Sequence, residues 1–183
     1  MPNGEAKVWR QGEAKADYYK ESLAEAKEYM EKTRKQRKVL KPSDMPWEDS
    51  PQGKIKHLSN ERMDIRIKTV DAYMQELPPG GRSGKHRHMA EECIVILEGK
   101  GYDMHWDTTV EIQDKYYWHT DKDPKRFDWE EGDVVYIPPN TVHQHFNANS
   151  ANPARFISAQ NRMYKYMGYN DLEQIENAPD YKG

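Results

Sequence analysis

The stretch that decides the fold of this chain is GGRSGKHRHMAEECIVILEG, residues 80–99. Its two histidines, His86 and His88, are two residues apart, and side chains at that spacing point to the same face of a β-strand. Glu92 follows four residues after His88. The next residues, 93–97, form an apolar run rich in β-branched side chains that stops at Glu98 and a glycine, which is typical of a strand entering a turn. The stretch therefore predicts strands that carry imidazole and carboxylate groups close together.

A second block, GDVVYIPPNTVHQHFN at residues 132–147, carries two more histidines after a pair of prolines. Residues 134–137 predict another strand, and the prolines turn the chain toward His143. Three imidazoles and one carboxylate are a donor set that suits a borderline divalent metal with open coordination positions. His145 has the same strand parity as His143, so we expect it to point into the same cavity as a hydrogen-bond donor or proton shuttle, or else to be a structural histidine at the mouth of the barrel.

The two blocks resemble the paired signature motifs of the cupin superfamily. The pattern G-x5-H-x-H-x3-E-x6-G is found between Gly80 and Gly99, and G-x5-P-x-G-x2-H-x3-N between Gly132 and Asn147. Asn140 stands where that family usually has glycine, but asparagine also tolerates the left-handed backbone that such a turn demands. The resemblance spans residues 63–161.

This resemblance implies an all-β fold, a double-stranded β-helix or jelly-roll barrel, here with an N-terminal α-helical extension. It also implies a set of metal ligands: His86, His88, Glu92 and His143. Fe(II) is the metal we expect first, although Mn, Ni, Co, Cu and Zn suit the same donors.

The function that the resemblance implies is an Fe(II) dioxygenase of a small aromatic or other oxygenated metabolite. Two alternatives stay open, because a fold and its ligands do not determine the chemistry. One is a non-oxidative metal-dependent enzyme, such as a decarboxylase, isomerase or lyase. The other is a non-catalytic protein that binds a small molecule.

Composition limits the classes of molecule that this chain is expected to bind. The 183 residues carry a net charge of -3, with a pI near 6.2 and a mean hydropathy of -1.15. This balance gives no electrostatic reason to expect nucleic acid or an anionic membrane as a partner. No apolar run approaches a membrane span, and residues 1–7 lack the hydrophobic core of a signal peptide. We therefore expect a cytoplasmic protein. The partners expected of it are a small-molecule substrate and a second copy of the chain in a homodimer.

The order of elements predicts three segments: a helix with a Pro-rich connector at residues 1–53, a barrel at 54–161 and a tail with a short helix at 162–183. The helix is expected from Glu13 to Leu40, a region without glycine or proline. Its apolar stripe should pack on the barrel or on a partner subunit; the stripe comprises Tyr19, Leu23, Ala26 and Met30.

Four local predictions complete the sequence analysis. A half-buried strand is expected over Met63–Leu77, and the polar, aromatic-bearing insertion at 107–128 is expected to act as a lid or a subunit contact. Asp171 should cap a short helix that ends near Ile175. The single cysteine, Cys93, is expected in the core.

Overall fold

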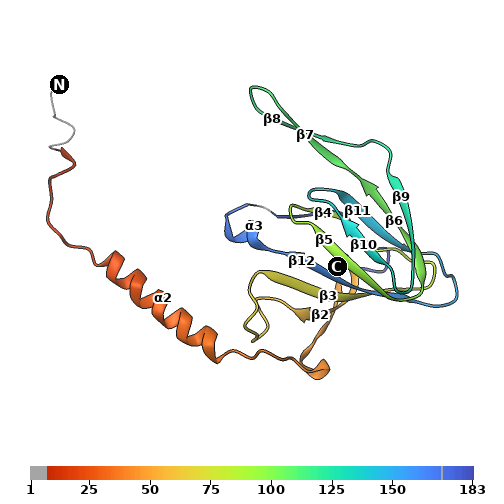
Figure 1. Ribbon diagram of the computed structural model, residues 1–183, viewed down its shortest axis with the longest axis horizontal. Helices are drawn as coiled ribbons and strands as arrows, with labels where there is room; N and C mark the ends of the chain where they lie inside the picture. Colours follow the sequence, from red (N-terminus) through yellow and green to blue (C-terminus); the bar gives the residue numbers. More distant parts are fainter. Residues whose placement is uncertain (1–7, 170) are drawn as a thin grey trace. The chain divides into compact units, whose positions relative to one another are not determined.

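The structure is a computed structural model that describes residues 8–169 and 171–183. The chain divides into two compact units, one that ends at Gln36 and one that runs from Arg37 to Gly183. Helix α2 (Tyr18–Lys35) lies in the first unit, and all the strands described lie in the second (Figure 1).

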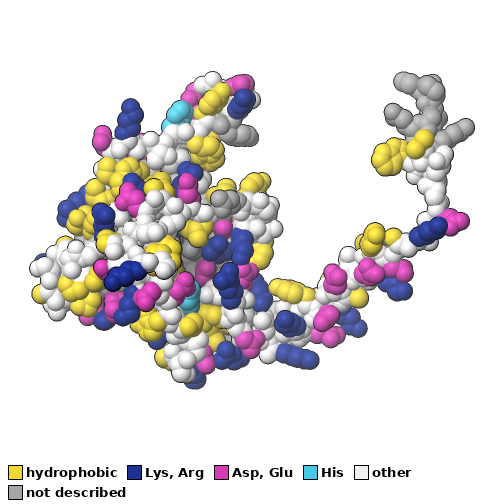
Figure 2. All heavy atoms as spheres, turned by 180° about the vertical axis from the view of Figure 1, so that it is seen from behind, with side chains coloured by type: hydrophobic (Ala, Val, Ile, Leu, Met, Phe, Trp, Pro, Cys, Tyr) yellow, Lys and Arg dark blue, Asp and Glu magenta, His cyan; other side chains and the backbone are white. Residues whose placement is uncertain are grey.

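Helix α2 is shorter than the predicted helix by several residues at each end, although its sequence is rich in strong helix formers. Basic side chains occupy its last turn, where they interact favourably with the helix dipole. None of its residues is buried, and charged side chains of both signs cover it (Figure 2). The packing partner expected for its apolar stripe stays a prediction. Among the residues described, no helix is both long enough and apolar enough to cross a membrane.

The described part of the second unit contains three antiparallel sheets. The six-stranded sheet has the order β1-β2-β3-β12-β5-β10: β1 (Trp47–Ser50), β2 (Gly53–Ser59), β3 (Val70–Leu77), β12 (Ala154–Asn161), β5 (Glu92–Glu98) and β10 (Val134–Ile137). The five-stranded sheet has the order β13-β4-β11-β6-β9: β13 (Leu172–Glu176), β4 (Lys85–His88), β11 (Val142–Asn147), β6 (Lys100–Trp106) and β9 (Lys125–Glu130). The third sheet is the hairpin of β7 (Thr108–Ile112) and β8 (Tyr116–Thr120).

Alternating burial along the strands places one side of each large sheet on a common core. In β12 every second residue from Ala154 to Gln160 is buried, and β5 alternates in the same way. The apolar core comprises Leu77, Ile94, Ile96, Trp129, Ile137, Ala154 and Phe156. The predicted fold class, an all-β jelly roll with an N-terminal helix, is confirmed.

Two predicted elements differ from the structure. Strand β3 starts at Val70 rather than Met63, because the preceding segment turns and Ile65 makes only an isolated bridge to Arg37. The helix predicted after Asp171 is wrong: Leu172–Glu176 is strand β13, which pairs with β4. Tertiary pairing to the edge of β4 overrides the local capping signal here, and the short helix of the tail, α3, is instead Met163–Tyr166.

The prediction that Cys93 is buried in the core is also wrong, because its thiol is exposed. Its neighbours in β5, Glu92 and Ile94, are each 1% exposed. Since successive side chains of a strand point to opposite faces, Cys93 must lie on the outer face of the sheet.

The insertion at 107–128 is an ordered hairpin rather than a loop. Strands β7 and β8 pair with each other, and β9 then joins β6 in the five-stranded sheet. In Figure 1 the hairpin extends away from the remaining strands. Its role as a lid or a subunit contact stays a prediction.

Candidate metal centre

Strands β4 and β11 bring three histidines together on the inner face of the five-stranded sheet. His86 and His88 alternate with half-buried neighbours along β4, and His143 on β11 is the direct cross-strand partner of His86. Their exposed fractions are 1%, 3% and 0%. The two-residue spacing of His86 and His88 therefore places both side chains on one face of β4, as strand parity predicts.

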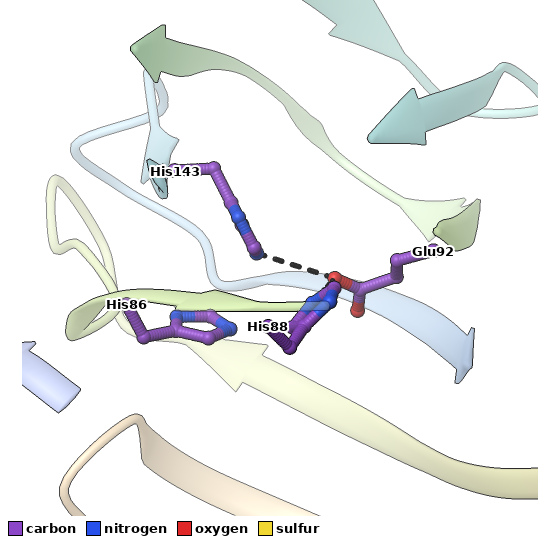
Figure 3. A group of neighbouring side chains, drawn as sticks. All are labelled: His86, His88, Glu92 and His143. Atoms are coloured by element: carbon purple, nitrogen blue, oxygen red, sulfur yellow. Dashed lines mark hydrogen bonds and ion pairs between the residues drawn. The ribbon is translucent and has the colours of Figure 1, made fainter. Parts of the chain in front are cut away.

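Glu92 approaches these histidines from the opposite sheet. It is the first residue of β5, and its side chain is directed toward His88 and His143 (Figure 3). Each of the four residues offers one ligand atom, and these atoms all lie within 4.8 Å of one another. The structure thus brings together the four residues that the sequence predicted as metal ligands: His86, His88, Glu92 and His143.

A tight turn just before His143 is hydrogen-bonded to the strand that carries His88. Asn140 has a φ of 60°, the left-handed region that its position in the motif requires. Its backbone N–H donates to the carbonyl of His88 at 2.9 Å. Asparagine therefore serves in this turn where the cupin motif has glycine, and the turn that precedes His143 is tied to the strand that carries His88.

Each imidazole is oriented by a backbone carbonyl close to it in the chain. Nδ1 of His88 lies 2.7 Å from the carbonyl oxygen of Ala90, and Nδ1 of His143 lies 2.9 Å from that of Thr141. Nδ1 of His86 is 3.5 Å from the carbonyl oxygen of Gly84. A carbonyl only accepts, so each Nδ1 carries the proton and each Nε2 keeps a lone pair.

The environment of the Nε2 atoms fits a cation. Nε2 of His88 and of His143 lie 2.9 Å and 3.2 Å from the same oxygen, Oε2 of Glu92. A neutral imidazole has only one N–H, and in these two rings a carbonyl already accepts it. Nε2 of His86 is buried and has no hydrogen-bond partner among the residues that the structure describes. A divalent metal among these atoms would accept all three lone pairs and the carboxylate, so the residues present fit the ion that the cupin motifs imply.

The second oxygen of Glu92 is held by residues that sequence analysis missed. The hydroxyl of Ser158 on β12 donates to Oε1, and the hydroxyl of Tyr73 on β3 lies 3.4 Å from the same atom. Both residues are buried. Their only sequence signal is strand parity, because nothing local shows which strands lie beside β5.

The protonation states also favour metal binding. Burial disfavours a charged carboxylate, but the neighbouring His143 and His88 outweigh it and hold the pKa of Glu92 well below its ordinary value of 4.5. Burial lowers the pKa of His86 well below 6.5, and burial also lowers that of His143. The site is therefore set to present an anionic oxygen at Glu92 and neutral imidazoles at His86 and His143.

His145 lies behind the ligands in a second buried polar cluster. Its ring is 5.4 Å from that of His143, between centroids, and its Nδ1 is 3.0 Å from Oδ1 of Asp103. The indole N–H of Trp129 donates to the same carboxylate oxygen at 2.8 Å. Burial opposes a charge on His145, yet Asp103 outweighs it and raises the pKa of the imidazole. Asp103 was missed by sequence analysis because only the register of β6 and β11 sets it opposite His145.

The remaining histidines that the structure describes lie outside the candidate ligand set. His105 is buried, with Nε2 3.6 Å from Oδ2 of Asp103. His57 pairs with Glu48 at 2.6 Å, and the exposed His119 lies 3.3 Å from Glu111. None of the three is among the ligands grouped above.

The family model described as auxin binding protein matches residues 32–178. The chain belongs to this auxin-binding-protein family. Among its relatives, auxin-binding protein T85 of Nicotiana tabacum is 28% identical over 142 residues, which are 76% of this chain and 72% of that protein. Auxin-binding protein T92 of the same plant is 23% identical over the same coverage.

Solved structures of similar fold include oxalate decarboxylases. The Lactobacillus farciminis enzyme in its formate complex has a TM-score of 0.55 at 18% identity, covering 73% of this chain and 34% of that chain. A tryptophan-to-phenylalanine variant of the B. subtilis enzyme has a TM-score of 0.57 at 17% identity, covering 76% and 33%. A further structure concerns the Mn(II) centres of the Bacillus subtilis enzyme. This chain spans about a third of the length of those chains. The family match and these folds together confirm the assignment to the cupin superfamily.

Proposed function

We propose that this protein is a metal-dependent enzyme that acts on a small oxygen-rich metabolite inside the barrel. The observation that carries the proposal is the arrangement of nitrogen and oxygen atoms around Glu92. Three imidazoles are fixed through Nδ1, and the Nε2 atoms converge with one buried carboxylate oxygen. Four protein donors leave coordination positions for a further molecule on an ion that takes five or six ligands.

A divalent ion held by these residues supplies Lewis acidity and a binding point for substrate oxygen atoms. The residues of the chain do the rest. Ser158 and Tyr73 fix the Glu92 carboxylate through its other oxygen, so its orientation does not depend on the ion. The burial of all four ligands keeps bulk water from competing for the donors.

Two reactions are compatible with this centre, and each has its own support. The cupin resemblance favours Fe(II) and the dioxygenase reaction expected from the sequence. The non-oxidative alternative, such as a decarboxylation, is favoured by the buried Asp103–His145 pair. Nε2 of His145 has no hydrogen-bond partner, so the imidazole can carry a proton to a reacting carbon or oxygen. Oxalate decarboxylases with Mn(II) centres share the fold.

The experiment that separates them is elemental analysis of anaerobically purified protein, followed by activity screens with Fe(II) or Mn(II). Phenols, keto acids and dicarboxylates are offered as substrates while oxygen uptake and carbon dioxide release are measured. Oxygen uptake with a phenol or keto acid supports the dioxygenase. Carbon dioxide release without oxygen uptake supports the non-oxidative enzyme.

The names of the Nicotiana relatives favour a third reading, a protein that binds an aromatic carboxylate without converting it. Calorimetry with indole-3-acetate tests it: binding that requires metal, without turnover of any compound, would support that reading. Protein that binds no divalent ion under any of these conditions would overturn the metal-dependent proposal itself.

A further inference from the structure

A cavity of about 610 Å³ lies at one end of the six-stranded sheet, outside the metal centre. Its walls come from parts of the chain that are far apart in sequence: the start of β1, the end of β2 with the segment that leads to β3, helix α3 and the first residue of β13. Among the described residues that line it, none is a candidate metal ligand. Its volume lies within the range that small-molecule sites usually have. We call it the β1–β3 cavity.

Backbone groups hold the walls of the β1–β3 cavity in place. The N–H of His57 on β2 donates to the carbonyl of Pro46 at 2.9 Å, which fixes the chain just before β1. The hydroxyl of Tyr166 donates to the carbonyl of Lys68 at 3.1 Å. This contact places α3 beside the segment that joins β2 to β3 (Figure 1). The cavity is therefore built by contacts between separate elements of the second unit.

The charged side chains that line the cavity leave two cations unpaired. Each of the three carboxylates faces a basic side chain: Glu48 faces His57, Glu61 faces Lys165 and Asp71 faces Arg162. Arg62 and Lys68 also line the cavity, and neither has an acidic partner among the residues that the structure describes. Unpaired positive charge in a concave surface attracts an anion.

Apolar side chains supply much of the remaining wall. Trp47, Val70 and Leu172 line the cavity and are 44%, 38% and 40% exposed. Burial raises the pKa of Asp71 above its ordinary value of 3.8, although the nearby Arg162 opposes this, so the wall at Asp71 is poorly hydrated. Charges attract each other more strongly in such surroundings than in water. The cavity thus offers apolar surface for the body of a ligand and cations for its charged group.

We propose that the β1–β3 cavity binds a small organic anion with an apolar or aromatic body, and that it does so without a metal ion. The charged group of the ligand lies by Arg62 and Lys68, and its body packs on Trp47 and Leu172. An uncharged molecule of the same shape loses the contact with the cations, so it binds more weakly. The inference does not depend on the metal-dependent activity proposed above, because the cavity and the metal centre share no residue.

The test uses the full-length protein and two fluorescent probes, 1-anilinonaphthalene-8-sulfonate and its uncharged parent N-phenyl-1-naphthylamine. Wild-type protein should bind one sulfonate per chain, more tightly than the uncharged probe. In the double variant Arg62→Met/Lys68→Met the Kd for the sulfonate should rise about tenfold, since each partly exposed cation contributes a few-fold. The Kd for the uncharged probe should stay the same.

The matched control is Lys122→Met, because Lys122 is also exposed but lies outside the cavity. It should bind both probes as wild type does. Trp47→Ala should weaken the binding of both probes, since it removes apolar wall. His86→Ala should bind the sulfonate as wild type does, with or without added Mn(II). Circular dichroism checks that each variant folds, and Lys68→Met alone replaces the double variant if that one does not.

Equal affinities for the sulfonate in wild type and in the double variant would overturn the proposal, because the probe would then lie elsewhere. An equal loss in Lys122→Met would overturn it as well, since the effect would be one of net charge. Binding that a folded His86→Ala variant has lost would place the probe at the metal centre and would also refute a separate site. A wild-type protein that binds both probes equally would show that the cavity does not select an anion.

Discussion

His88 shows at the scale of one residue why the centre suits a metal ion. Both of its ring nitrogens face oxygen atoms that accept hydrogen bonds, the carbonyl of Ala90 and the carboxylate of Glu92. A neutral imidazole satisfies only one of them, whereas a metal at Nε2 satisfies the ring and the carboxylate together. His143 has the same arrangement, because its two ring nitrogens face the carbonyl of Thr141 and the carboxylate of Glu92. The arrangement is therefore a property of the site and not of one side chain.

Replacing His86 by alanine should abolish stoichiometric metal binding. The variant should still fold, because the imidazole contributes no apolar core contact and its Nε2 has no hydrogen-bond partner. Metal content per chain, measured by mass spectrometry of the purified protein, checks this expectation. His119→Ala, at an exposed histidine on β8, is the control and should bind metal as wild type does. Full metal occupancy in His86→Ala would refute the ligand assignment.

Ser158→Ala should weaken metal affinity without removing the site. Loss of the hydroxyl frees Oε1 of Glu92, and such supporting contacts typically contribute about 10–100-fold in affinity. Titration with a fluorescent competitor chelator gives the Kd. Ser50→Ala is a matched control, because Ser50 is also buried but its hydroxyl donates to the backbone of Gly53. Equal Kd values in the two variants would show that Ser158 does not position the ligand.

Among the elements, strand β6 leaves no room for a side chain at Gly101. Gly101 lies opposite Trp129 on β9 and Asn147 on β11. A Cβ at this position would come within 2.0 Å of the carbonyl oxygen of Phe146 and 2.4 Å of the Trp129 ring. The strand therefore admits only glycine where the Trp129 ring crosses it.

Gly101→Ala should destabilise the barrel by about 1–3 kcal/mol, the usual cost of overpacking. Trp129 would have to move, and its fluorescence and the hydrogen bond from its indole N–H to Asp103 would change with it. Urea unfolding followed by tryptophan fluorescence measures the loss. Lys100→Ala, the exposed preceding residue, should change the free energy of unfolding by no more than about 0.5 kcal/mol. A Gly101→Ala variant as stable as wild type would contradict the packing described.

Strands β2, β3 and β12 are joined by a charged pairing that depends on pH. The hydrogen bond from Lys54 holds the pKa of Glu76 below 4.5; partial burial opposes this, and Arg155 adds to the lowering. A carboxyl whose pKa is lower in the folded state stabilises the fold above its unfolded pKa and loses that contribution as pH falls through the folded value.

Glu76→Gln should therefore lower the free energy of unfolding by about 1 kcal/mol at pH 7. The difference from wild type should shrink as pH falls below 4.5 and vanish once Glu76 is protonated in both states. Chemical unfolding at a fixed protein concentration, repeated between neutral and acidic pH, measures it. A difference that stays constant over this range would show that the charge of Glu76 contributes nothing.

At the scale of the whole molecule, the metal should act as a link between the two sheets. Three ligands come from the five-stranded sheet and Glu92 comes from the six-stranded one. A metal that binds only the folded chain stabilises it by mass action, about 2.7 kcal/mol when the free metal is at about 100 times its Kd.

Removal of the metal with a chelator should therefore lower the Tm by roughly 5–10 °C for a domain of this size. Differential scanning calorimetry with and without added Mn(II) or Fe(II) gives the shift. The His86→Ala variant should have the same Tm under both conditions. If the Tm of the wild-type protein is also the same with and without added metal, no metal links the two sheets.

Sequence analysis identified the residues of the candidate metal centre better than the residues around it. His86, His88, Glu92 and His143 were found because each lies in a short motif, and strand parity indicated that the first two share a face. Ser158, Tyr73 and Asp103 were not found, because each contacts the site only through the pairing of strands distant in sequence. The errors at Cys93 and after Asp171 have the same origin, since an apolar run does not show which of its faces meets solvent and a capping residue does not show that a strand edge is open.

The amino-acid sequence by itself determined the class of fold, the N-terminal helix and the four residues that would hold a metal. It did so because three patterns can be recognised within about 20 residues: the alternation of apolar and polar residues, the composition of helices and the spacing of motifs. Only the tertiary structure decided that Glu92 meets the histidines from the opposite sheet and that Asp103 lies beside His145. These depend on register between strands as far apart along the chain as β3 and β12, and register is set by the packing of the whole barrel.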